Sequence, residues 1–167
     1  PPILAFLLPG AIISQTIVHT LNKFKSVPSN NVPVLEVQEQ VAKDNKESVK
    51  PKGQRKYNLV LLGATGFTGQ LALEYLARNY TKDVKWAIAG RNPKKLAEVV
   101  KKVKEIVPSW SGEVDIIPCD TSNYEQVYRM CAQSDVIAST AGPFALLGTN
   151  VVAASSSTGT DYVDITG

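Results

Sequence analysis

Residue types that build metal sites and covalent cross-links are scarce in this sequence. Its 167 residues include one histidine, His19, and two cysteines, Cys119 and Cys131. A single distant histidine and two thiols do not form the spacing of a metal site, so we expect no bound metal. A disulfide between the cysteines is unnecessary in a domain of this size. We expect both to be small buried apolar residues in a reducing compartment.

Charged side chains are absent from residues 1–22, and no methionine begins the chain, so we expect the sequence to start inside a longer protein. Three interpretations of this apolar leader remain open: a membrane-associated or signal-anchor helix, a cleavable targeting segment, and an extension packed on the domain. We favour the first, because Lys23 and Lys25 follow and would hold the downstream side in the cytoplasm. This predicts the cytoplasmic face of a membrane or lipid body. A mitochondrial location is the second choice, because arginine is absent before Arg55.

The excess of positive charge is confined to the first part of the chain. Residues 1–56 hold eight basic and four acidic side chains, whereas residues 57–167 hold ten and eleven. The later part therefore offers no support for a nucleic-acid surface. Residues 23–56 contain several prolines and many charges, which predicts a flexible basic linker. Within it, Val34–Val41 could form a short helix or a strand.

Two familiar phosphate-binding patterns are missing from the stretch that organises the rest of the chain. Residues 57–69 contain neither the Gly-x-Gly-x-x-Gly fingerprint nor the Gly-Lys-Ser/Thr of a P-loop. Instead, an apolar run ends in glycines at positions 63, 66 and 69, and a helical apolar pattern follows. This predicts a strand, a glycine-rich turn and a helix whose N-terminus binds a phosphate. A tight turn without a ligand is the alternative.

Strand and helix patterns alternate through the rest of the chain. Asn92 and Pro93 are typical of a helix start, and Ser122 with Glu125 forms a capping-box pattern. We therefore predict an α/β fold over residues 57–167, a doubly wound and mainly parallel Rossmann-like sheet, preceded by a non-globular leader. The later strands are predicted at Val84–Ala89, Val114–Pro118, Val136–Thr140 and Tyr162–Ile165.

An acidic residue is also missing from the end of the second predicted strand, where an NAD site usually binds the ribose. Gly90, Arg91 and Asn92 stand there instead. Arg91 could bind a 2′-phosphate through two hydrogen bonds, so we predict NADP in preference to NAD. A solvated basic helix start is the alternative for Arg91, and a helix-capping role is the alternative for Asp120. The predicted cofactor-binding residues are Gly63, Ala64, Thr65, Gly66, Phe67, Thr68, Gly69, Arg91, Asn92, Asp120, Thr140, Ala141 and Gly142.

Several of these motifs together resemble the saccharopine dehydrogenase-like oxidoreductase family. They are Gly-Ala-Thr-Gly-Phe-Thr-Gly at 63–69, the run at 86–91, Cys119-Asp120, Ala-Gly-Pro-Phe at 141–144 and Tyr-Val-Asp-Ile-Thr-Gly at 162–167. The first alone is shared with extended short-chain dehydrogenases and NmrA-like proteins. The resemblance implies an N-terminal nicotinamide-cofactor domain, followed by a larger domain for a small-molecule substrate and for homodimer formation. We expect that second domain to lie outside this sequence.

The same resemblance implies association with membranes or lipid bodies in some eukaryotic relatives, and enoyl reduction on lipid-like substrates in some bacterial ones. It does not imply saccharopine dehydrogenase activity itself. We predict an NADP-dependent oxidoreductase whose present piece binds the cofactor without turnover. An NADP(H) sensor of the NmrA type, and a membrane-tethered module with a vestigial nucleotide fold, are the alternatives.

No residue has sequence support as a catalytic acid or base. The Tyr-x-x-x-Lys pair of short-chain dehydrogenases does not occur in this sequence. Tyr162 and Asp164 follow the last predicted helix, but a role in the core is the favoured interpretation of both. The catalytic residues are therefore left unassigned.

Overall fold

The central element of the fold is a five-stranded, all-parallel sheet. The computed structural model describes residues 34–45, 49–80 and 82–165. The strand order is β3-β2-β1-β4-β5, so the sheet grows outward on both sides of the first strand, as in doubly wound folds. The strands are β1 (Tyr57–Leu62), β2 (Trp86–Gly90), β3 (Asp115–Pro118), β4 (Ser134–Ser139) and β5 (Asp161–Asp164).

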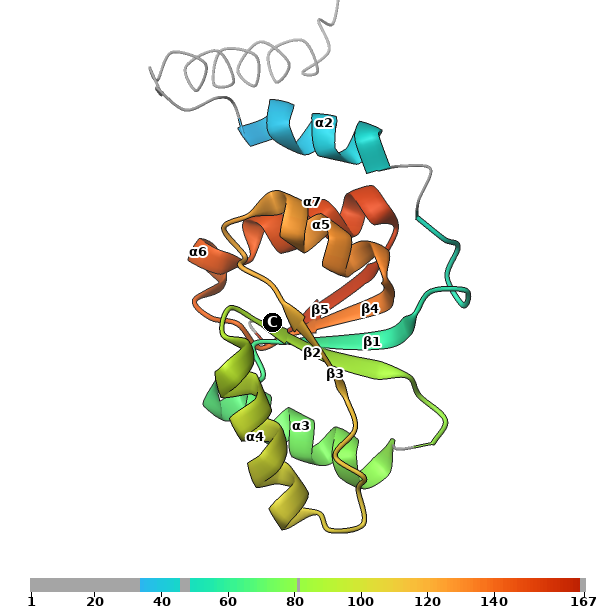
Figure 1. The fold of residues 1–167 in the computed structure, drawn as a ribbon. Helices are drawn as coiled ribbons and strands as arrows, with labels where there is room; N and C mark the ends of the chain where they lie inside the picture. Colours follow the sequence, from blue (N-terminus) through green and yellow to red (C-terminus); the bar gives the residue numbers. More distant parts are fainter. Residues whose placement is uncertain (1–33, 46–48, 81, 166–167) are drawn as a thin grey trace, which may run out of the picture. The chain divides into compact units, whose positions relative to one another are not determined.

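Helices cover both faces of this sheet (Figure 1). α3 and α4 lie side by side on one face, and α5 and α7 lie on the other. This arrangement confirms the predicted Rossmann-like fold class. The bounds are α2 (Val34–Asn45), α3 (Phe67–Asn79), α4 (Pro93–Ile106), α5 (Tyr124–Ala132), α6 (Phe144–Leu147) and α7 (Thr149–Thr158).

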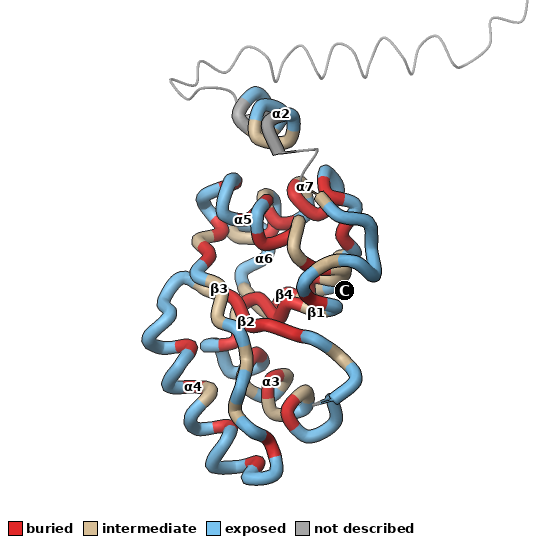
Figure 2. Tube along the Cα trace, turned by 45° about the vertical axis from the view of Figure 1, so that its right-hand side comes forward, coloured by how far each residue is buried: buried red, intermediate tan, exposed pale blue. Residues whose placement is uncertain are grey.

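The strands of the sheet centre are buried on both faces (Figure 2). Because side chains alternate along a strand, β1 supplies two separate cores. Val60 and Leu62 pack in the cluster under α5 and α7, and Leu61 packs in the cluster with α3 and α4. All three are at most 2% exposed. Uniformly apolar strands of this kind are expected where helices cover both sides of a parallel sheet.

One predicted helix cap is confirmed and the other is wrong. Asn92 caps α4 by accepting a hydrogen bond from the Lys95 amide at 3.1 Å. The capping box at Ser122 does not form, because Asn123 caps α5 and the Ser122 hydroxyl donates to Asp120 instead. The segment Val34–Val41, left open between a helix and a strand, is a helix that extends to Asn45. Ile106 continues the apolar period of α4, yet it is 53% exposed.

The segment predicted as a linker contains α2 and then approaches the domain through Lys50–Lys56. In α2, Val41 and Ala42 pack against the cluster that includes α5 and α7. Arg55 donates hydrogen bonds to the domain from both terminal guanidinium nitrogens, and its Nε donates to the Lys50 carbonyl oxygen. The predicted leader, residues 1–22, lies outside the described residues. Among the helices that the structure does describe, none combines the length and apolarity that crossing a bilayer requires.

Both cysteines lie in the core, and burial determines their acidity. Cys119 is 1% exposed and Cys131 is fully buried. Burial raises the pKa of Cys119 from 9.0 to about 12, and that of Cys131 to about 11. The folded state therefore favours the protonated thiols.

We expect this preference to make the free energy of unfolding fall as the pH rises. Below pH 9 both states hold protonated thiols and the stabilisation is complete. Above pH 9 the unfolded thiols ionise first, so stability is lost between pH 9 and about 12. Denaturant titrations at pH 8 and pH 10.5 measure the loss. A Cys119→Ala/Cys131→Ala variant should lose less, and an identical loss in both proteins would refute the assignment.

Candidate functional site

The carboxyl ends of the central strands meet in one crevice. Its volume is about 180 Å³. The loops after β1, β2, β3 and β4 all contribute, as expected for a ligand site beside the first strand of a doubly wound sheet. The lining residues are Leu62, Gly63, Thr65, Gly66, Gly90, Arg91, Cys119, Thr121, Thr140, Ala141, Gly142 and Leu147.

The turn after β1 depends on glycine at two positions. Gly63 has a φ of +89°, and a Cβ there would lie 2.7 Å from the Ala141 amide nitrogen. Gly69 lies in the first turn of α3, where a Cβ would lie 2.7 Å from the Ala64 Cα. The first glycine therefore allows the chain to leave the strand beside the β4 loop. The second allows the helix to pack closely against the turn.

Gly66 and the start of α3 form a cradle of main-chain donors. Gly66 is the N-cap residue, and no side chain caps this helix end. The first amides of a helix have no partner within the helix, so those of Phe67, Thr68 and Gly69 can bind an anion. A Cβ on Gly66 would meet only the Gly63 oxygen, at 3.5 Å. The space above Gly66 is thus open, as a pyrophosphate would require.

Arg91 brings a positive charge to the same crevice. Within the part of the chain that the structure describes, its guanidinium forms no ion pair. Asp120 lies near enough to be affected by it. Hydrogen bonds from the Ser122 amide and hydroxyl lower the pKa of Asp120, and the charge of Arg91 lowers it further. Arg91 is therefore an exposed cation without an ion-pair partner among the described residues. Its guanidinium could bind a 2′-phosphate through two hydrogen bonds.

Seven of the predicted cofactor-binding residues line the crevice: Gly63, Thr65, Gly66, Arg91, Thr140, Ala141 and Gly142. Six lie beside it. Ala64 and Gly69 are buried in the turn, and Thr68 belongs to the donor cradle. Asn92 caps α4, and Asp120 accepts a hydrogen bond from the Ser122 amide. The Phe67 side chain is 80% exposed.

Five crevice residues were not among the predicted set: Leu62, Gly90, Cys119, Thr121 and Leu147. The first four adjoin predicted strand ends, so extending each predicted loop by one residue would have found them. Leu147 belongs to the four-residue helix α6. A helix of one turn has no periodic signal, and nothing in the sequence marks this residue.

Tyr162 is partly buried beside the core, in keeping with the structural role that its sequence position favours. It packs against the buried cluster under α5 and α7. Burial, with a smaller contribution from Asp164, raises the pKa of its hydroxyl to about 12. A phenol with so high a pKa is a poor proton donor near neutral pH. Tyr162 is therefore poorly suited to act as a general acid in this structure.

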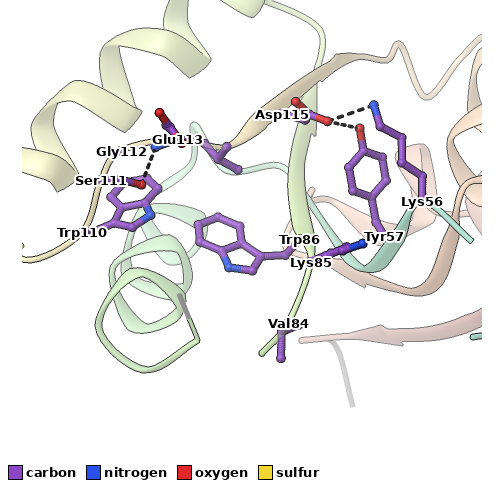
Figure 3. A pocket seen from close by; sticks show the side chains of 11 residues that line it. Lys56, Tyr57, Val84, Lys85, Trp86, Trp110, Ser111, Gly112, Glu113 and Asp115 are labelled. Carbon is purple, nitrogen blue, oxygen red and sulfur yellow. Dashed lines mark hydrogen bonds and ion pairs between the residues drawn. The ribbon is translucent and has the colours of Figure 1, made fainter. Parts of the chain in front are cut away.

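A larger hollow, of about 670 Å³, lies at the opposite end of the sheet, where the strands begin (Figure 3). Asp115 accepts hydrogen bonds there from the Tyr57 hydroxyl at 2.6 Å and the Lys56 ammonium at 2.9 Å. These bonds lower the pKa of Asp115. Trp86 and Trp110 also line the hollow, and their rings stack with centroids 5.6 Å apart. Lys56 and Asp115 neutralise each other there, and none of the described residues that line this hollow begins a helix. The smaller crevice is therefore the candidate site.

Comparison with known proteins agrees with this site. Residues 59–167 match the family described as the saccharopine dehydrogenase NADP binding domain. The chain is 38% identical over 121 residues to a saccharopine dehydrogenase-like oxidoreductase of Mus musculus, covering 68% of this chain and 28% of that protein. It is 37% identical over 114 residues to a trans-acting enoyl reductase of Mycobacterium ulcerans, with 68% and 26% covered. The chain thus spans about a quarter of the length of these relatives.

Among solved structures, the fold is similar to apo saccharopine dehydrogenase (L-Glu forming) from Saccharomyces cerevisiae. The TM-score is 0.52 at 25% identity, covering 65% of this chain and 21% of that one. The matched family region begins within β1 and includes every strand and loop that forms the crevice. The chain therefore belongs to the saccharopine dehydrogenase NADP-binding domain family, and NADP is the cofactor for which that domain is named.

Proposed function

We propose that this chain is the NADP(H)-binding part of an oxidoreductase, with the substrate held by residues beyond it. The observation that carries the proposal is the crevice itself, where an uncapped helix N-terminus and an unpaired arginine meet. The relatives are named as oxidoreductases and reductases, which supports the same reaction class. When bound, the cofactor would supply hydride transfer. The chain's own residues bind and orient it.

Each part of the crevice has a separate task in this proposal. The amides at the start of α3 bind the pyrophosphate, and Gly66 leaves room for its approach to the backbone. Gly142, whose Cβ position is open space, allows the nicotinamide half to pass close to the β4 loop. The strands behind these loops are buried, so the donors are held rigidly. Cofactor binding thus needs little rearrangement of the chain.

Arg91 distinguishes the two nicotinamide cofactors. It follows the last residue of β2, where an acidic side chain would select the ribose hydroxyls of NAD. A cation at this position instead attracts the 2′-phosphate that only NADP carries. Neighbouring Asp120 stays ionised, because its pKa is lowered by its hydrogen bonds with Ser122. Arg91 therefore remains the group able to neutralise the phosphate.

We expect Arg91→Ala to weaken NADPH binding by about 10- to 100-fold and to leave NADH binding unchanged. Hydrogen bonds to charged groups contribute about 1.5–3 kcal/mol, which corresponds to this range of affinity. Isothermal titration of the 167-residue chain with both nucleotides measures the effect.

Arg129→Ala is the matched control, because Arg129 lies on α5 and forms an ion pair with Glu125. It removes the same side chain and charge, and both affinities should remain at the unaltered level. An equal loss of NADPH and NADH affinity in Arg91→Ala would contradict the phosphate contact. Failure of the unaltered chain to bind either nucleotide would contradict the proposed function.

A further inference from the structure

α3 presents a stripe of large apolar side chains to solvent. Phe67, Leu71 and Tyr75 follow one another at intervals of four residues, so they share one face of the helix. Phe67 is 80% exposed, Leu71 53% and Tyr75 58%. The opposite face of α3 buries Gly69, Leu73 and Ala77 against the sheet. The stripe is therefore surplus to the core, and an exposed apolar patch of this kind commonly marks an interaction site.

α4 continues this surface beside α3 (Figure 1). A hollow of about 210 Å³ lies between the two helices, and Leu71, Val103 and Ile106 contribute apolar walls. Ile106 is 53% exposed, although the rest of the apolar face of α4 is largely buried. Lys102 also lines the hollow. The exposed apolar residues of both helices thus form one surface with a basic edge, which we call the α3/α4 face.

The two helices of the α3/α4 face carry a net positive charge. α4 has five lysines, at positions 94, 95, 101, 102 and 104, against Glu98 and Glu105. None of these seven side chains forms an ion pair in the described part of the chain, and Lys104 donates a hydrogen bond to the Ser111 carbonyl oxygen. On α3, Glu74 and Arg78 pair with each other at 2.7 Å, so their charges cancel. Lys102, which lines the hollow, is therefore available to an anionic partner.

We propose that the α3/α4 face binds the surface of an anionic lipid bilayer. Exposed phenylalanine, leucine and tyrosine side chains would enter the interface, and the lysines would contact the headgroups. This combination of apolar and basic groups is the one that interfacial helices use. A second copy of the chain fits less well, because a symmetric contact would bring the lysine-rich helices together. The proposal requires neither residues 1–22 nor cofactor binding.

The test places an environment-sensitive fluorophore on the face. Leu71→Cys and Ile106→Cys each introduce one accessible thiol, since Cys119 and Cys131 are buried. Val152→Cys is the matched control, because Val152 is an exposed apolar residue on α7, across the sheet. The labelled full chain is mixed with vesicles of phosphatidylcholine, alone or with phosphatidylserine. We expect a blue shift from the Leu71 and Ile106 probes on anionic vesicles only.

A lysine variant tests the electrostatic part. One lysine near an anionic surface contributes a roughly five-fold gain in partitioning. Lys102→Gln should therefore raise the lipid concentration needed for half of the Leu71 probe's shift about five-fold. Arg129→Gln, with the same charge change on α5, should leave it unchanged. Vesicle binding without a shift at either probe would overturn the proposal, as would no vesicle binding. A shift that depends on protein concentration without lipid would instead indicate self-association, and would also overturn it.

Discussion

Gly69→Ala is expected to lower the free energy of unfolding by about 3 kcal/mol and to abolish measurable nucleotide binding. A methyl group at this position would overlap the Gly63 carbonyl oxygen and would lie 2.7 Å from the Ala64 Cα. These are backbone atoms, so no side chain can rotate away. The helix must instead move from the turn, and overpacking of this kind costs about 1–3 kcal/mol. Urea denaturation and NADPH titration measure the two effects.

Gly66→Ala is the informative comparison, because it adds the same methyl group three residues earlier. Its nearest neighbour would be the Gly63 oxygen at 3.5 Å, an ordinary contact. We expect stability to fall by only about 1 kcal/mol, which is the typical cost of alanine at an N-cap position. Nucleotide affinity should fall more than about tenfold, because the methyl group occupies the approach of the pyrophosphate. Unimpaired binding by Gly66→Ala would contradict the proposed position of the phosphate.

Arg55→Ala is expected to destabilise the domain by about 3 kcal/mol without changing nucleotide affinity. The Arg55 guanidinium donates to the Ser134 and Thr158 carbonyl oxygens at 2.7 and 2.6 Å, and to the Thr160 hydroxyl at 2.6 Å. It also donates to the Lys50 carbonyl oxygen at 2.9 Å. Removing it leaves partly buried acceptors without a donor, which costs more than the loss of an exposed bond. Chemical denaturation followed by tryptophan fluorescence measures the change.

Two further variants separate the geometry of Arg55 from its charge. Arg55→Lys keeps the positive charge, but an ammonium group cannot reproduce the planar set of guanidinium donors. It should therefore recover less than half of the stability that Arg55→Ala loses. Arg78→Ala removes an exposed arginine that forms an ion pair with Glu74, and stability should change by less than about 0.5 kcal/mol. Full rescue by lysine would show that charge, and not the hydrogen-bond geometry, stabilises this region.

Local sequence patterns predicted the features that depend on neighbouring residues, such as strands, turns and helix caps. The apolar run of β1 and the three glycines after it specify a strand, a turn and a helix, and these formed as expected. Asn92 before Pro93 predicted the start of α4 correctly. The convergence of the strand-end loops also followed from the alternation of strands and helices, because parallel strands place their carboxyl ends at one edge.

Other features could not be read from local patterns. Asn123 displaced Ser122 as the cap of α5, because either side chain can accept a hydrogen bond and the Asp120 loop selects between them. Ile106 matched the apolar period of α4, yet periodicity cannot show where the sheet beneath a helix ends. The role of Arg55 depends on residues 79 to 105 positions away, a separation at which sequence patterns carry no signal.

The contacts of Arg55 also constrain how the domain is completed during synthesis. Arg55 precedes β1, but its acceptors Thr158 and Thr160 adjoin β5, the last strand. Nearby, Lys52 pairs with Asp161 in the same way. Lys52 and Arg55 therefore cannot form these particular contacts until almost all of the domain has left the ribosome. Closure of a loop of this length is a late event, so these contacts form only after the C-terminal strand has been made.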